Sequence, residues 1–298
     1  MLRKNYRQNR LLYWMLAPAL IYVVIFNYVP MFGLVIAFQD YSVFGGIFNS
    51  RWVGLQHFQD FFSGMYFSRT LKNTLSLSLL DLLFNFPAPI ILALMLNEVR
   101  SAPYKRILQT VSYMPHFISM VVVAGIIKEF TSATGPVAQL VTLFGGQARS
   151  YISQPQYFRT IFVISEIWQT IGFNSIIYLA ALTGISEELY EAAQIDGAGA
   201  IRRLWNITLP GIAPTIIIML ILRCGAIMNV NFEKVLLLYS PATYKTSDII
   251  STYVYRVGIK DQQLGYSTAV GLFNSVVSLL LVLTANKLSK TFTETSMF

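Results

Sequence analysis

Long apolar runs constrain the fold of this sequence more than any other feature. Six runs of about 20 or more mainly apolar residues succeed one another through the 298-residue chain. They lie at about 11–38, 71–96, 107–127, 161–182, 211–230 and 267–288. A helix of about 20 residues crosses the ~30 Å hydrocarbon layer of a bilayer while pairing its own backbone amides. The sequence therefore predicts an all-α integral membrane protein with six transmembrane helices in a single membrane domain, residues 1–298.

Composition excludes a water-soluble globular protein. Hydrophobic residues make up 55% of the chain and charged residues only 12%, against about 25% charged residues in soluble domains. The net charge of +8 could attract nucleic acid, but the basic residues form short clusters beside the apolar runs instead of a stripe interleaved with aromatics. We therefore expect the lipid bilayer as a partner and no nucleic acid. The single cysteine, Cys224, excludes an internal disulfide and a cysteine-based metal site.

The distribution of basic residues predicts an orientation in the membrane. The first apolar run is too long for the core of a signal peptide and has no small-residue cleavage site, so it should be retained as a span. Lysine and arginine are denser in the two ends, the 97–106 connector and segment 186–210 than in the three longer loops, one of which contains Lys234. Because cytoplasmic segments carry the excess of positive charge, we expect both termini and segment 186–210 in the cytoplasm.

Segment 186–210 is the longest charged interruption between two apolar runs. Ser186 followed by two glutamates is typical of a helix start, and this helix should run to about Ile195. Asp196-Gly197 should end it, because glycine takes positive φ without steric cost. A second short amphipathic helix should follow, and Pro210 should close it. Two short helices joined at a glycine and tethered by spans at both ends form a compact knob that another protein could bind.

The spacing in this segment resembles the EAA loop of the membrane subunits of binding-protein-dependent ABC importers. The pattern is E-A-A, three residues, glycine, nine residues and I-x-L-P. The matching positions, with the aspartate that precedes the glycine, are Glu191, Ala192, Ala193, Asp196, Gly197, Ile207, Leu209 and Pro210. The resemblance implies a type I ABC importer permease fold whose cytoplasmic coupling helices sit in a cleft of an ATPase subunit. A cytoplasmic helix-turn-helix connector without a partner is the alternative.

Other segments are similar to the branch of this family that imports oligosaccharides in bacteria, often those released from plant or algal polyuronides. They read W-V-G-L-Q-H-F, L-N-E-V-R-S, S-Y-M-P-H-F-I-S, A-V-G-L-F-N-S and E-T-S-M-F, and they extend the resemblance over nearly the whole chain. The resemblance implies a multi-pass protein of the bacterial cell membrane. Its implied partners are a second permease subunit in a heterodimer, two ATPase subunits and an extracellular solute-binding lipoprotein that delivers the oligosaccharide.

Catalytic motifs are absent from the sequence. It contains no G-x-x-x-x-G-K-[ST] phosphate loop, no G-x-S-x-G elbow and no zinc-ligand cluster. We therefore expect a transport subunit and not an enzyme, with no cofactor bound by this chain and with ATP and Mg on the partner ATPase.

Polar residues within the apolar runs are candidates for a substrate path, because such groups are costly in lipid. Glu166, Gln169 and Phe173 share one helix face, and a carboxylate, an amide and an aromatic ring suit a sugar. Packing between subunits is the alternative. By resemblance, carbohydrate importers contact sugar on the spans before and after the EAA loop. This implies contacts from Glu166, Gln169 and Phe173, and from Cys224, Met228 and Asn231.

Two further charges lie inside apolar runs. Arg223 would either neutralise Glu166 or bind a uronate carboxylate, since guanidinium and carboxylate groups match in bidentate geometry. Asp81 and Asn85 precede two prolines, and we expect them to form helix-to-helix hydrogen bonds. An ion-coupled secondary transporter of a polar solute, with Asp81 or Glu166 carrying a proton, is the main alternative function, although no internal repeat is visible. An intramembrane hydrolase is the second, although paired catalytic groups are lacking.

Overall fold

The computed structural model describes residues 2–293, and the side chains of residues 9–291. Apart from a two-residue antiparallel pairing of β1 (Gln39–Asp40) with β2 (Arg51–Trp52), the regular structure of this part is helical. Five described helices are long and apolar enough to cross a membrane. They span Asn9–Phe38, Met65–Glu98, Pro155–Leu182, Ala200–Gly225 and Leu264–Thr291. The predicted all-α membrane fold is confirmed, and a sixth span results if one bent helix pair counts as a crossing.

The bent pair falls on the third predicted span, residues 107–127. Helices α6 (Ala102–Tyr113) and η4 (Met114–Phe117) meet α7 (Met120–Phe130) at an angle of 99°. Pro115 supplies no backbone N–H, and Ile118 and Ser119 take extended conformations that interrupt the helical hydrogen bonds. The third predicted span is therefore a broken span or a re-entrant loop and not one continuous helix.

The fifth predicted span, residues 211–230, also differs in the structure. Helix α12 (Leu209–Gly225) ends five residues earlier than expected, and the chain then turns irregularly into α13 (Phe232–Leu238). Asn231 accepts a hydrogen bond from the Lys234 N–H at 3.2 Å and so starts α13 as its N-cap. The polar residues after Gly225 belong to this turn instead of to a membrane-crossing helix.

The described residues form two compact units, one made of residues 2–64 with 254–273 and the other of residues 65–253 with 274–293. The single domain expected from the sequence stays a prediction. The first unit contains α1 (Leu2–Val23), η1 (Val24–Tyr28), η2 (Val29–Phe38), α2 (Gly46–Asn49), α3 (Gln56–Ser63) and η7 (Arg256–Lys260). Its aromatic core is Phe61, which is buried against Tyr266 and Phe273 in the first part of α16 (Leu264–Thr293).

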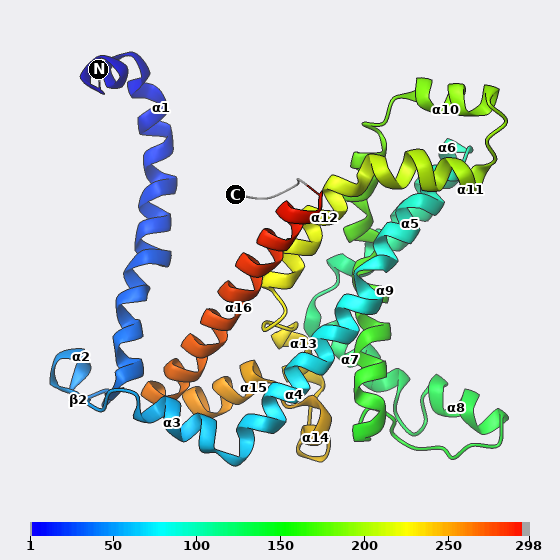
Figure 1. Cartoon of the computed structure of the whole chain (residues 1–298). Coiled ribbons are helices and arrows are strands. Elements are labelled where there is room, and N and C mark those ends of the chain that lie inside the picture. Colours follow the sequence, from blue (N-terminus) through cyan, green and yellow to red (C-terminus); the bar gives the residue numbers. More distant parts are fainter. Residues whose placement is uncertain (1, 294–298) are drawn as a thin grey trace. The chain divides into compact units, whose positions relative to one another are not determined.

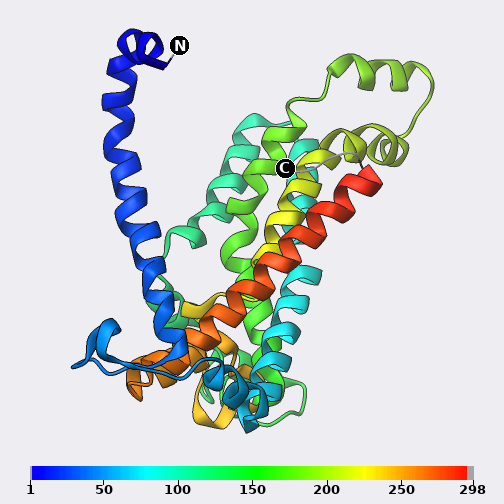
Figure 2. The ribbon, with the colours of Figure 1, turned by 60° about the vertical axis from the view of Figure 1, so that its left-hand side comes forward.

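The second unit is organised around α9 (Pro155–Leu182), the longest helix within it, which packs against α5, α6 and α12 (Figure 1). Its other elements are α4 (Met65–Leu80), η3 (Asp81–Asn85), α5 (Pro87–Glu98), α8 (Pro136–Leu143), α10 (Glu187–Ile195), α11 (Ala200–Arg203), η5 (Leu204–Thr208), η6 (Pro241–Thr243), α14 (Tyr244–Ser247) and α15 (Ile250–Tyr255). Its main core cluster joins α9 to α4, α7 and α13, and it includes Leu77, Val123, Phe158, Phe162 and Val235. Figures 1 and 2 show α10 and α11 at one end of this unit and α8 and α14 at the other.

Gly172 is the point of closest approach between α9 and α6. A Cβ at this position would overlap the backbone carbonyl of Ser112. We expect Gly172→Ala to lower the free energy of unfolding by about 1–3 kcal/mol, because one of the two backbones must move. Gly125→Ala in α7 is the control, since a Cβ there meets no heavy atom within 4 Å. Thermal unfolding of the detergent-purified protein measures both, and equal stabilities of the two variants would contradict the prediction.

Candidate functional site

Segment 186–210 contains two helices joined at Gly197, as predicted. Ser186 caps α10 by accepting a hydrogen bond from the Glu188 N–H at 3.3 Å. At the other end, the Gly197 N–H donates to the Gln194 carbonyl at 3.0 Å, and the Ala198 N–H donates to the Ala193 carbonyl at 2.8 Å. These two bonds form a Schellman motif, in which the residue after the C-cap takes positive φ. Gly197 has φ 73°. The three residues between E-A-A and the glycine therefore form the end of α10, and the glycine terminates this helix.

The second half of the segment runs directly into a membrane-spanning helix. Helix α11 continues through the π turn η5 into α12, and the whole stretch from Ala200 to Gly225 is one candidate span. The expectation that Pro210 closes a separate helix is therefore wrong. Pro210 lies in the first turn of α12, directly after the widened π turn, where a missing N–H is tolerated. The helical path from α11 to Gly225 is thus continuous.

The two arms of the segment enclose a surface hollow and expose large apolar side chains. The Tyr190 hydroxyl and the Thr208 Oγ1 lie 3.0 Å apart and join α10 to η5. Ile195 is 87% exposed and Trp205 is 66% exposed. The hollow between the arms is lined by Ala193, Asp196, Ala198, Arg202, Arg203, Asn206 and Ile207. Exposed apolar groups around a polar hollow are typical of a protein contact site.

The predicted coupling residues divide between this hollow and its edges. Ala193, Asp196 and Ile207 line the hollow. The other five predicted positions are Glu191, Ala192, Gly197 and Pro210, which are exposed, and Leu209, which is half-buried. All eight lie between α10 and the start of α12, at one end of the second unit (Figure 1).

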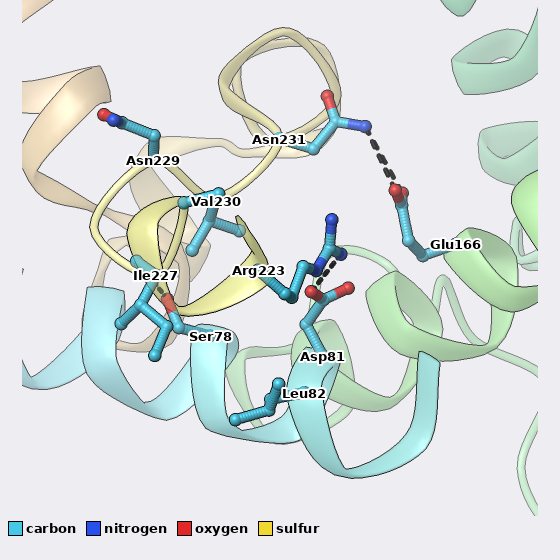
Figure 3. Close-up of a pocket in the computed structure, with 10 residues that line it drawn as sticks. Ser78, Asp81, Leu82, Glu166, Arg223, Ile227, Asn229, Val230 and Asn231 are labelled. Carbon is cyan, nitrogen blue, oxygen red and sulfur yellow. Dashed lines mark hydrogen bonds and ion pairs between the residues drawn. The ribbon is translucent and has the colours of Figure 1, made fainter. Parts of the chain in front are cut away.

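A second candidate site is a charged cavity of about 180 Å³ between α4, η3, α9 and the end of α12 (Figure 3). It is lined by Ser78, Asp81, Leu82, Glu166, Arg223, Ala226, Ile227, Asn229, Val230 and Asn231. The π turn η3 carries Asp81, and Arg223 lies in the last turn of α12, where the carbonyl end of a helix favours a cation. Because α12 ends early, the residues of the following turn form one wall, namely Ala226, Ile227, Asn229, Val230 and Asn231.

Asp81 and Arg223 form an ion pair that faces this cavity. Asp81 also accepts a hydrogen bond from Asn85 at 3.0 Å through Oδ1, and Thr170 of α9 donates to Asn85 Oδ1 at 3.2 Å. The helix-to-helix hydrogen bonding expected of Asp81 and Asn85 is therefore present. It connects α12, η3 and α9 at a depth where unpaired charges would be costly.

Glu166, which also lines the cavity, forms an ion pair with Lys234, a residue that was not predicted to belong to the site. Lys234 Nζ lies 2.9 Å from Glu166 Oε2, and the Lys234 side chain is fully buried. Asn231 Nδ2 lies 3.3 Å from both carboxylate oxygens. The hypothesis that Arg223 neutralises Glu166 is therefore wrong, because Lys234 does so. The expectation that Lys234 lies in a loop outside the membrane is also wrong. Its ammonium group contacts Glu166 in the middle of the candidate span Pro155–Leu182.

The predicted substrate-path residues are only partly assembled around the cavity. Glu166, Arg223 and Asn231 line it (Figure 3). Gln169 instead accepts a hydrogen bond from Lys234 Nζ at 3.5 Å. Phe173 stacks on the ring of His116, with centroids 3.9 Å apart, next to the break between η4 and α7. Met228 is fully buried in the protein, and the half-buried Cys224 is not among the residues that line the cavity.

The fold, the exposed two-helix segment between spans and the charged cavity define the membrane subunit of a transporter. The chain belongs to the family of binding-protein-dependent transport system inner membrane components, whose family model matches residues 85–293. It is a permease of the bacterial ABC importer class, in agreement with the resemblance found in the sequence.

Two curated relatives come from Bacillus subtilis (strain 168). Protein LplB is 47% identical, over 98% of this chain and 92% of the relative. The polygalacturonan/rhamnogalacturonan transport system permease protein YteP is 45% identical, over 98% of this chain and 91% of the relative.

Two similar solved structures contain a bacterial transporter of an acidic polysaccharide. One is a crystal structure of an ABC transporter involved in the import of alginate, with a TM-score of 0.91, 46% identity, and coverage of 98% of this chain and 99% of the other. The second is a bacterial alginate ABC transporter in complex with an alginate pentasaccharide-bound periplasmic protein, with a TM-score of 0.90, 45% identity and 99% coverage of both chains. These findings confirm the fold class and the carbohydrate-transport family.

Proposed function

We propose that this chain is the membrane-spanning subunit of an ATP-driven importer that translocates an oligosaccharide delivered by an extracellular solute-binding protein. The observation that carries the proposal is segment 186–210, here called the coupling segment, in which every position of the EAA pattern is filled and Gly197 takes the positive φ that ends α10. The names of the relatives support a carbohydrate cargo, since one is a polygalacturonan/rhamnogalacturonan permease.

The proposed partners follow from what the chain contains and what its relatives assemble with. Two ATPase subunits, which would hold ATP and Mg, bind the coupling segments, and a second permease completes the path as a heterodimer. The alginate transporter in complex with a loaded periplasmic protein supports an extracellular solute-binding lipoprotein as the delivery partner. In the proposed orientation within the bacterial cell membrane, segment 186–210 and both termini are cytoplasmic.

The proposed mechanism uses the continuous helical path from Ala200 to Gly225. Closure of the ATPase subunits displaces α10 and α11, and α12 carries that displacement to Arg223 at the cavity. Glu166, Arg223 and Asn231 form the wall of the substrate path in the described conformation. Gln169, Phe173, Cys224 and Met228 are proposed to reach substrate only after the rearrangement that alternating access entails.

Glu191→Arg tests the ATPase contact directly. Glu191 is exposed on α10, so the change should not disturb folding of this chain. If Glu191 faces a basic partner, the like charge should lower ATP-dependent uptake by about 10- to 100-fold. The assay is uptake of labelled oligosaccharide into proteoliposomes that contain both permeases, the ATPase subunits and the solute-binding protein.

The matched control is Gln194→Arg, which adds the same charge at an exposed position on α10 outside the motif. Wild-type uptake by Glu191→Arg would contradict the proposed docking. Uptake that persists without ATP but collapses with a protonophore would instead favour an ion-coupled transporter.

A further inference from the structure

Arg223 is the most solvent-accessible charge of the cavity cluster. Ion pairs in the second unit include Arg69–Asp248, Arg223–Asp81 and Lys234–Glu166. The Arg223 side chain is 38% exposed, whereas Asp81 is 13% exposed and Lys234 is fully buried. Arg223 also lines a second cavity of about 210 Å³, on the side of Asn85 and Tyr178. Arg223 therefore borders two cavities.

The surroundings of Arg223 allow it to change partner. Asp81 retains Asn85 as a hydrogen-bond donor, and the Thr170 hydroxyl lies 3.2 Å from Asn85 Oδ1. Glu166 needs no charge from Arg223, because Lys234 and Asn231 already satisfy its carboxylate. Figure 3 shows Arg223 between Asp81 on one side and Asn231 and Glu166 on the other. An anion that enters the cavity thus meets one accessible cation.

From this geometry we infer that Arg223 is a specificity-determining residue that binds the carboxylate of an acidic sugar, and that Asp81 occupies it when the site is empty. The inference rests on the proposed function and specifies the cargo as a uronate-containing oligosaccharide. The planar guanidinium group matches a carboxylate in a bidentate contact that a neutral sugar cannot offer. Exchange of one carboxylate for another keeps the cation paired throughout, so no unpaired charge is left at membrane depth.

Competition between Asp81 and the sugar carboxylate for Arg223 would assist release of the sugar. A guanidinium group without an internal partner would hold an anionic sugar tightly and delay its release. Because Asp81 returns to Arg223 as the sugar leaves, the internal ion pair assists release. This mechanism predicts that the two partners of the pair differ in their effects on transport, which a purely structural ion pair does not predict.

The test compares Arg223→Gln, Asp81→Asn and the double variant in the reconstituted complete transporter. The probes are tetragalacturonate and its fully methyl-esterified form, which has the same chain length without the charge. We expect Arg223→Gln to lower tetragalacturonate uptake by about 10- to 100-fold, the range of one charge-assisted hydrogen bond. We expect Asp81→Asn to lower the KM for tetragalacturonate, and the double variant to keep the low uptake of Arg223→Gln.

If the Asp81–Arg223 ion pair were purely structural, the three variants would behave differently. Either single change would then impair uptake similarly, and the double variant, which contains no unpaired charge, would recover. That recovery, or wild-type tetragalacturonate uptake by Arg223→Gln, would overturn the inference. If the Arg223→Gln variant does not assemble with its partners, the double variant still distinguishes the inference from a purely structural pair. It can be tested because removal of both charges leaves neither group unpaired.

Arg69→Gln is the matched control for a broken arginine–aspartate pair. Arg69 Nη2 lies 2.9 Å from Asp248 Oδ2, its side chain is 33% exposed, and it lies outside the cavity. Arg69→Gln should leave the ratio of tetragalacturonate uptake to methyl-ester uptake unchanged even if the variant protein is less stable. Absence of ATP-dependent uptake of both probes in the wild-type transporter would contradict the proposed function itself, whereas uptake of both with no change of ratio in Arg223→Gln would contradict only the inference.

Discussion

Gly197→Pro is expected to lower ATP-dependent oligosaccharide uptake by about 100-fold while the chain still inserts into the membrane. Gly197 has φ 73°, whereas proline is restricted to about −65°, so the Schellman ending of α10 cannot form. The substitution also removes the N–H that donates to Gln194 at 3.0 Å. Together these changes cost about 3 kcal/mol or more, which corresponds to about 100-fold in a docking equilibrium.

The matched control for this variant lies two residues away. Gly199 has φ −67°, which is already the proline value, and a Cβ there meets no heavy atom within 4 Å. Gly199→Pro should therefore transport at close to the wild-type rate. Membrane yield, ATPase activity and uptake should be measured together in both variants. Equal uptake by Gly197→Pro and Gly199→Pro would show that the angle between α10 and α11 does not control coupling.

Lys234→Met is expected to lower the free energy of unfolding by about 3–5 kcal/mol. The substitution keeps most of the side-chain volume but leaves the buried Glu166 carboxylate with the Asn231 amide as its remaining hydrogen-bond donor among the described side chains. An uncompensated charge at membrane depth is costly, so α13 should separate from α9 and uptake should fall with stability. Thermal unfolding of the detergent-purified complex measures the change.

The double variant Glu166→Gln/Lys234→Met separates charge from packing. It removes both charges and should regain most of the lost stability, because a buried ion pair is often replaceable by neutral groups. Lys245→Met is the surface control, since Lys245 is exposed in α14 and should change stability by less than about 0.5 kcal/mol. If Lys234→Met is as stable as Lys245→Met, the ion pair between Lys234 and Glu166 does not contribute to the stability of the protein.

The coupling segment was predictable because its structure is local in sequence. Ser186 caps a helix that begins at the next residue, and Gly197 ends it through hydrogen bonds that reach back no further than Ala193. The spans were predictable for a related reason, since the requirement for apolar side chains in lipid acts on each segment separately. The boundary at Pro210 was misjudged because proline ends a helix in general but is tolerated in a first turn.

The cavity was less predictable because its contacts join distant segments. Asp81 and Arg223 are 142 residues apart, and Glu166 and Lys234 are 68 residues apart. The periodicity of a single helix cannot show which of these charges pair. A signal for Lys234 was nevertheless present, since M-N-V-N-F-E-K is a polar run that follows an apolar one without a loop between. Similarly, Pro115 within S-Y-M-P-H-F-I-S indicated a break in the third span.

In the proposed transport cycle, the ion pairs Asp81–Arg223 and Glu166–Lys234 limit the response of the empty site to voltage. The charges of Asp81, Glu166, Arg223 and Lys234 cancel, so rearrangement of the empty site displaces little net charge through the membrane field. The field then acts mainly on the cargo. For the uronate cargo proposed above, each carboxylate carried inward across an inside-negative membrane requires about 2.3 kcal/mol of electrical work per 100 mV, so import of a longer chain becomes progressively more demanding as the membrane polarises.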